Sequence, residues 1–141
     1  MTPVIVSIQH TGARFLSERF GLEWNDIIHT NQPLVDVIDK IDGRDIITPL
    51  RHPEDVWRSW CKRYIHLDTT TRLSRLMSSV FTLGNLSMHH NIDFIAVDKQ
   101  EDSRISDWSK VCHNPKDVEY PEVDLSYFWE MSFIREHYDA N

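Results

Sequence analysis

The fold of this chain of 141 residues is decided by residues 4–12, which read VIVSIQHTG. Residues 4–8 form a largely β-branched run that is too short for a helix and apolar enough for a strand buried on both faces. Gly12 then allows a tight turn, and apolar residues at helical spacing follow as far as Gly21, where the helix is expected to end. The stretch therefore predicts a strand, a glycine turn and a helix.

The same alternation recurs along the rest of the chain. Apolar runs predict further strands at 26–29, 45–50 and 92–97. Apolar strands alternating with helices predict one three-layer α/β domain over residues 1–141, in which a mainly parallel sheet of about four strands is flanked by helices. Helices are predicted at 34–41, from Pro53, from Thr69 to about Met88, at 105–112 and at 127–138, with a loop at 114–124.

Ligands of such sheets bind beyond the carboxyl ends of the strands. That edge holds residues 9–14, residues 51–55 and the segment after Val97. At the first of these, free backbone N–H groups and the helix dipole favour an anion. Gly12 permits the close approach of a phosphate, while Thr11 and Arg14 add a hydroxyl and a positive fork.

A second pair of residues supports a phosphate site. Arg51 ends a predicted strand, and Ser59 lies about two turns into the helix that follows. Together the guanidinium and the hydroxyl can clamp one phosphate. The alternative is structural, with Arg51 in a salt bridge at the sheet edge and Ser59 as a packing residue.

Composition limits the classes of function. The chain is 40% hydrophobic and 26% charged, and its formal net charge of −7 argues against broad binding to DNA or RNA. Any anionic ligand must then be captured by a local site. Cys61 and Cys112 lack zinc-finger spacing and indicate reduced thiols. With no apolar run of roughly 20 residues and no signal-peptide pattern, we expect a cytoplasmic protein that does not bind membranes.

Both motifs resemble those of the sulfotransferases. Residues 8–15, IQHTGARF, are similar to the family's loop, usually written Pro-Lys-Ser/Thr-Gly-Thr/Ser-Thr/Ser followed by an aromatic or aliphatic residue. Residues 51–60, RHPEDVWRSW, resemble its strand-Arg-x-Pro-x-x-x-x-x-Ser segment. The likeness covers residues 3–66, continues more loosely through 92–97, and is closest to the short sulfotransferase-like proteins of bacteriophages.

The resemblance implies a single sulfotransferase-like domain with a P-loop-like fold, and it implies a ligand. In the family, the loop holds the 5′-phosphosulfate of 3′-phosphoadenosine 5′-phosphosulfate, and the Arg and Ser hold its 3′-phosphate. By that resemblance Arg51 and Ser59 bind the 3′-phosphate of this donor, or of a related adenine nucleotide, without a metal ion. The 5′ end of the nucleotide is then expected to be bound by the loop residues Gln9, His10, Thr11, Gly12, Ala13 and Arg14.

The loop departs from the family at three positions. His10 stands where the family has the lysine that steadies the bridging oxygen, and Ala13 and Arg14 replace two hydroxyl residues. His10 can donate a proton or a hydrogen bond, and Arg14 can offset the charge of the sulfate. Transfer also needs a base for the acceptor. His29, at the end of the second predicted strand, and Asp98, after the last one, are the candidates by position.

Three functions are compatible with these features. The first is a sulfotransferase-like enzyme acting on an unknown small-molecule or protein acceptor. The second, favoured by the missing lysine, is a non-catalytic nucleotide-binding protein, such as a phage protein that inhibits a host protein in the host cytoplasm. A nucleotide kinase is less favoured, because residues 9–15 lack the lysine and serine expected from Gly-x-x-x-x-Gly-Lys-Ser/Thr.

Several other features are assigned structural roles. Trp57 and Trp60 lie on an apolar helical stripe, so we expect them in the core. Arg72 and Arg75 are expected on a solvated helix face, although they can reach an anionic ligand across the cleft. Residues 89–90 are both histidines but have no further metal ligand nearby, so we expect no metal site.

Overall fold

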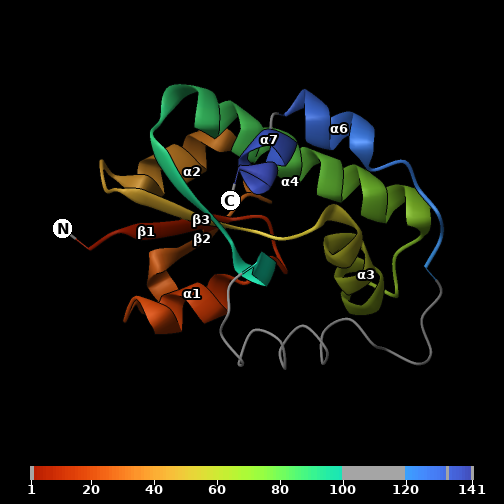
Figure 1. The fold of residues 1–141 in the computed structure, drawn as a ribbon, viewed down its shortest axis with the longest axis horizontal. Helices are drawn as coiled ribbons and strands as arrows, with labels where there is room; N and C mark the ends of the chain where they lie inside the picture. The colour runs from red at the N-terminus through yellow and green to blue at the C-terminus, as the bar shows by residue number, and fades with distance from the viewer. Residues whose placement is uncertain (1, 100–119, 133, 141) are drawn as a thin grey trace.

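The computed structural model describes residues 2–99, 120–132 and 134–140, and its centre is a parallel sheet (Figure 1). Within these residues the sheet has four strands in the order β2-β1-β3-β4, and all neighbours pair in parallel. The predicted parallel sheet is confirmed, and each strand is one residue shorter than predicted. The strands are β1 (Val4–Ser7), β2 (Ile27–His29), β3 (Ile46–Leu50) and β4 (Ile92–Ala96).

The strand order reverses between β1 and β3. From β1 the chain moves outward to β2, then returns past β1 to β3 and continues outward to β4. Ile5 on β1 is the partner of Ile27 on one side and of Ile47 on the other. A reversal of this kind opens a crevice at the carboxyl ends of the two central strands, where ligands of open α/β sheets bind.

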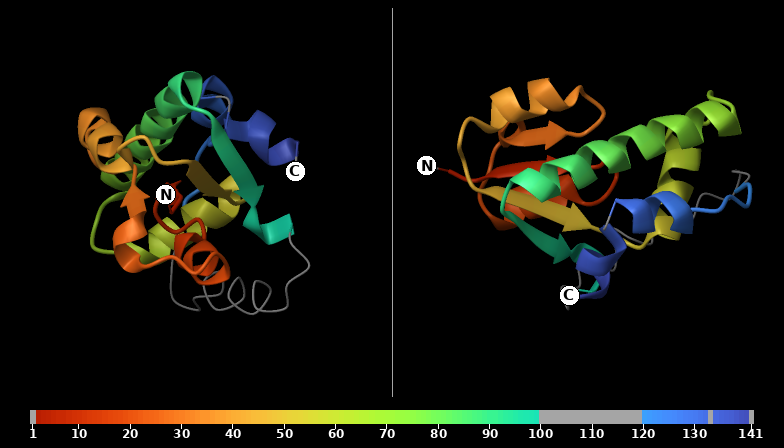
Figure 2. Two further views of the ribbon diagram at one scale, coloured as in Figure 1. Left: turned by 90° about the vertical axis from the view of Figure 1, so that its left-hand side faces the viewer. Right: turned by 90° about the horizontal axis from the view of Figure 1, so that it is seen from above.

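Helices cover both faces of the sheet (Figures 1 and 2). One face is covered by α1, the other by α2, α4, α6 and α7, while α3 lies beyond the carboxyl end of β3. This arrangement is the predicted three-layer α/β fold. The helices are α1 (Ala13–Arg19), α2 (Leu34–Ile41), α3 (Pro53–Arg63), α4 (Thr69–His89), α6 (Ser126–Met131) and α7 (Ile134–Asp139).

Two apolar clusters hold these layers together. Val4 and Val6 belong to the larger cluster, whereas Ile5, between them, belongs to the cluster under α1. This alternation follows from the two-residue period of a strand. On α4, the side chains that belong to the larger cluster form a stripe at helical spacing. Complete burial of each of these side chains contributes about 1.5–3 kcal/mol to the free energy of unfolding. The stripe consists of Leu76, Val80, Leu83 and Leu86.

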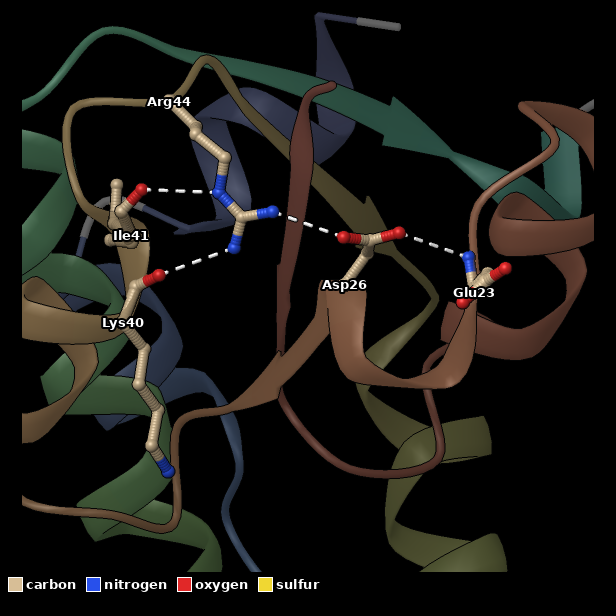
Figure 3. Close-up of polar contacts among 5 residues, drawn as sticks. All are labelled: Glu23, Asp26, Lys40, Ile41 and Arg44. Atoms are coloured by element: carbon tan, nitrogen blue, oxygen red, sulfur yellow. Dashed lines mark hydrogen bonds and ion pairs between the residues drawn. The ribbon is translucent and has the colours of Figure 1, made fainter. Parts of the chain in front are cut away.

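A polar network ties α2 to the start of β2 (Figure 3). The Arg44 guanidinium lies 3.0 Å from the Asp26 carboxylate and donates to two carbonyls at the end of α2, at 3.2 and 3.3 Å. Asp26 also accepts a hydrogen bond from the Glu23 N–H, at 3.0 Å. The short 3₁₀ helix η1 (Trp24–Asp26) is therefore fixed at both ends.

The C-terminal segment differs from the prediction of one helix over 127–138. The structure has two helices, α6 and α7, with Ser132 between them. Ser132 packs directly on the backbone of α4, because a Cβ atom built on Gly84 would lie only 2.8 Å from the Ser132 Cβ. The break lets Trp129 of α6 and Ile134 of α7 both enter the core.

Two further predictions fall partly or wholly outside the described residues. These are the helix at 105–112 and the first part of the loop at 114–124. Among the helices that are described, none has the length and apolar character needed to cross a bilayer.

Candidate anion-binding site

A cavity of ≈ 670 Å³ lies at the carboxyl end of the sheet. It is bounded by the loop after β1, by η1, by the end of β2 and by the second half of α3. Its position agrees with the crevice expected from the reversal of strand order. The lining residues are Gln9, His10, Gly12, Ala13, Arg14, Trp24, His29, Ser59, Lys62, Arg63 and Tyr64.

Among the described residues that line this cavity, every permanently charged side chain is positive. Arg14, Lys62 and Arg63 line it together with two histidines, and no carboxylate is among its described lining residues. The chain as a whole carries a formal charge of −7. Positive charge is thus concentrated at one cavity of an acidic protein, which is what the local capture of an anion requires.

The loop after β1 adopts a conformation that glycine favours. Gly12 has φ +103°, and the non-glycine His10 has φ +66°. A Cβ atom at Gly12 would lie 3.0 Å from a methyl group of Val97, in η2 (Val97–Lys99). Glycine is therefore required here by the backbone angle and by the contact with Val97. Since α1 has only seven residues, the cationic side chains carry most of the attraction for an anion.

The structure does not bring Thr11 to the cavity. Its side chain is buried, and its hydroxyl donates to the Ile8 carbonyl at 2.6 Å. This bond closes the turn after β1. Thr11 thus shapes the predicted binding loop from within, and the hydroxyl predicted to face a phosphate is already engaged.

Arg51 and Ser59 lie together, as the two-turn spacing predicts. Arg51 is 2% exposed, and its Nη1 donates to the Ser59 hydroxyl at 3.1 Å and to the His10 carbonyl at 2.9 Å. Of the pair, Ser59 lines the cavity. Because the Ser59 oxygen accepts from Arg51, its own proton can be donated toward the cavity. Arg51 therefore holds the loop and Ser59 in place, and it is not itself among the described residues that line the cavity.

His10 belongs to a chain of polar and aromatic contacts between the loop and α3. The Tyr64 hydroxyl donates its proton to Gln9 Oε1 at 3.1 Å and lies 3.3 Å from His10 Nε2. The Trp60 indole N–H donates to the Gln9 carbonyl at 2.9 Å. Since Tyr64 uses its proton on Gln9, His10 must be the donor in the other bond, with its hydrogen on Nε2.

Both histidines of the cavity are neutral at neutral pH. Burial, and then the positive charge of Arg63, lower the pKa of His10 from 6.5 to about 4. Burial also lowers the pKa of His29, whose Nδ1 lies 3.2 Å from the Ser7 hydroxyl. His10 therefore does not supply the permanent positive charge that a lysine would.

Trp24 stands at the rim of the cavity. It is 67% exposed, its ring lies edge-on to His29 at 6.3 Å, and the Arg14 guanidinium is 6.0 Å from its centroid. The network at Arg44 (Figure 3) holds the 3₁₀ turn that carries this ring. An exposed indole beside cations provides a surface on which a flat base can stack.

The sequence interpretation missed Trp24, Lys62, Arg63 and Tyr64. For two of them a signal was present, because Lys62 and Arg63 follow Ser59 by three and four residues on α3. Residues at this spacing share one helix face. A helix that brings Ser59 to a ligand therefore brings these two cations with it.

Asp98 lies away from the cavity. Its Oδ2 accepts hydrogen bonds from the His52 N–H at 2.9 Å and from the Tyr138 hydroxyl at 3.0 Å. Burial, together with the charge of Asp98, raises the pKa of Tyr138. The structure thus ties Asp98 to α7 and to the start of α3, and of the two predicted bases it brings only His29 to the cavity.

The structural assignments made from sequence have mixed outcomes. Trp57 and Trp60 are buried, as predicted. The prediction of a solvated face is wrong for Arg72, which is 6% exposed. Its guanidinium donates to the carbonyls of Tyr64 and Leu67 and lies over the Trp57 ring. Arg72 therefore closes the corner between α3 and α4, a long-range role that helical periodicity does not encode.

Comparisons of the chain with protein-family profiles, with curated proteins and with solved structures found no match. Within the described residues, no group of three or more potential metal ligands is present.

Proposed function

We propose that this chain binds a phosphorylated nucleotide in the cavity at the carboxyl end of the sheet. One observation carries the proposal: three cationic side chains and the Ser59 hydroxyl line a cavity without described carboxylates, in a chain with a net charge of −7. A multiply charged ligand matches such a lining better than a neutral one, because each phosphate oxygen can accept charge-assisted hydrogen bonds.

Different lining residues are available for the two phosphates and for the base of such a ligand. Arg63 and Ser59, on one face of α3, are placed for one phosphate, and Arg14, at the start of α1, for another. Trp24 at the rim offers its ring to the base. The resemblance to sulfotransferases supports an adenine nucleotide phosphorylated at the 3′ and 5′ positions, with a reducing cytoplasm as the proposed location.

Sulfuryl transfer is a second candidate, and His29 is the observation that favours it. This histidine lines the same cavity as the loop and has a lowered pKa. A neutral imidazole can accept the proton of an acceptor hydroxyl. Because His10 is neutral as well, Arg14 and Lys62 are the lining groups that can offset the charge of a leaving phosphate. Nucleotide binding requires none of these steps and is therefore the better supported function.

Calorimetric titration with adenosine 3′,5′-bisphosphate tests the proposal. We expect saturable binding by the wild type and about tenfold or greater weakening in each of Arg14→Gln and Arg63→Gln, since a charge-assisted hydrogen bond contributes about 1.5–3 kcal/mol. Arg135→Gln is the matched control, because Arg135 forms an exposed ion pair with Asp139 on α7, away from the cavity. Absence of binding, or equal weakening in all three variants, would contradict the proposal.

A further inference from the structure

A second cavity, of ≈ 330 Å³, lies beside the first. The two share Gln9 and Tyr64, whose side chains are joined by a hydrogen bond of 3.1 Å. The second cavity extends from this pair toward the segment after β2 and the middle of α4. Its lining residues are Gln9, Asn31, Trp60, Tyr64, Arg75, Ser78 and Ser79.

Ser79 is the most informative residue of this second cavity. It is 1% exposed, and its hydroxyl has no hydrogen-bond partner in the described structure. Helical serines commonly donate to a carbonyl of the preceding turn. Ser17 does so to Arg14 and Ser87 does so to Gly84, both at 2.7 Å. Ser79 instead keeps its hydroxyl buried and unpaired beside the cavity, an arrangement that is unfavourable unless a bound molecule satisfies it.

The remaining groups of the second cavity define the chemistry of its ligand. Arg75 supplies one cation. Burial raises the pKa of Tyr64, and the positive charges of Arg63 and Arg75 oppose this rise. Asn31 and Ser78 add neutral donors, and no carboxylate is among the described lining residues. A single guanidinium with neutral donors matches a monoanion, and the planar guanidinium matches a carboxylate in particular.

The aromatic walls indicate what the rest of the ligand is like. Trp60 and Tyr64 lie side by side, with ring centroids 4.9 Å apart, and both line the cavity. Cavities of this size, apolar on one side with a few convergent polar groups, take small organic molecules. We propose that this second cavity binds a small organic carboxylate, with the acid on Arg75 and Ser79 and its apolar body against Trp60 and Tyr64. This site does not depend on nucleotide binding.

Benzoate is a suitable probe, with benzamide as its neutral counterpart. Titration of ¹⁵N-labelled protein followed by NMR is expected to shift the amide signals of Ser78, Ser79 and Asn31. Arg75→Gln is expected to weaken benzoate binding about tenfold or more, because it removes a charge-assisted contact. Benzamide should bind more weakly to the wild type and should not respond to this substitution.

Ser79→Ala separates a ligand role from a folding role. Removing an unpaired buried hydroxyl is neutral or stabilising for the fold, so the melting temperature should be unchanged or higher while benzoate binding weakens several-fold. Ser74→Ala, at an exposed position of the same helix, is the control and should change neither. A lowered melting temperature with unchanged benzoate binding would overturn the proposal. So would benzoate shifts that depend on Arg63→Gln and not on Arg75→Gln, since they would place the carboxylate in the first cavity.

Discussion

Replacement of Gly12 by alanine tests the geometry of the loop that forms the first cavity. The backbone there has φ +103°, where an L-residue is strained by roughly 1–2 kcal/mol. The added Cβ would also lie 3.0 Å from a methyl group of Val97, which is 1% exposed and has little room to move. Overpacking of this kind adds roughly 1–3 kcal/mol. We therefore expect Gly12→Ala to lower the free energy of unfolding by roughly 2–5 kcal/mol.

Urea denaturation measures this loss, and Gly21→Ala is the matched control. Gly21 also has a positive φ, +66°, but a Cβ atom built there meets nothing within 4 Å. Gly21→Ala should therefore lower the free energy of unfolding by only roughly 1–2 kcal/mol, the contribution of the backbone angle. In a Val97→Ala background, the loss caused by Gly12→Ala should fall toward that of the control, because the contact has been removed.

A finding that Gly12→Ala is no more destabilising than Gly21→Ala would rule out the close contact between Gly12 and Val97. That result would mean that the loop and η2 do not approach as closely as the structure has them. An unchanged loss in the Val97→Ala background would refute the assigned contact in the same way. Because Gly12 also lines the cavity, any folded Gly12→Ala protein should bind adenosine 3′,5′-bisphosphate more weakly.

Three further predictions concern pH and polar contacts. The pKa of His10 is about 4 in the folded chain, whereas an ordinary histidine has a pKa of 6.5. As the pH drops, the unfolded chain therefore binds this proton before the folded chain does. The free energy of unfolding should fall between pH 6.5 and about pH 4, by about 3 kcal/mol in total. His10→Asn, which suits a positive φ, should flatten a plot of unfolding free energy against pH. Tyr64→Phe should abolish the preference of His10 for the Nε2–H tautomer, as read from its ¹⁵N shifts. Arg44→Ala should lower the unfolding free energy by about 1–2 kcal/mol, whereas Arg135→Ala, whose ion pair is exposed, should change it by less than about 0.5 kcal/mol.

The layers of the fold could be predicted because their signals are local. The apolar run before Gly12 and the proline at the start of α3 each specify an element within a few residues, and alternation of strands and helices then specifies the parallel sheet. The break between α6 and α7 could not be predicted in this way. It depends on the contact between Ser132 and Gly84, two residues far apart in the chain.

In the candidate site, too, some features could be predicted from the sequence and others depend on contacts between distant residues. The backbone positions of Gly12 and Ser59 follow from the order of elements, because the carboxyl ends of parallel strands meet at one edge. The directions of side chains do not follow from that order. Thr11 turns inward to the Ile8 carbonyl, and Asp98 joins Tyr138, because their surroundings come from tertiary packing. Trp24 reaches the rim because the network at Arg44 holds its turn, which no motif in the sequence indicates.

Binding of a phosphorylated nucleotide in the first cavity is the function that we propose for this chain. The most direct test is an NMR titration of ¹⁵N-labelled protein with adenosine 3′,5′-bisphosphate. We expect saturable shifts of the amides of Gly12, Ala13 and Arg14 and of residues 59–64 at the end of α3. We also expect a rise in the pKa of His10, because the bound anion offsets the nearby positive charge. Shifts confined to other parts of the chain, or no shifts at all, would contradict the proposal.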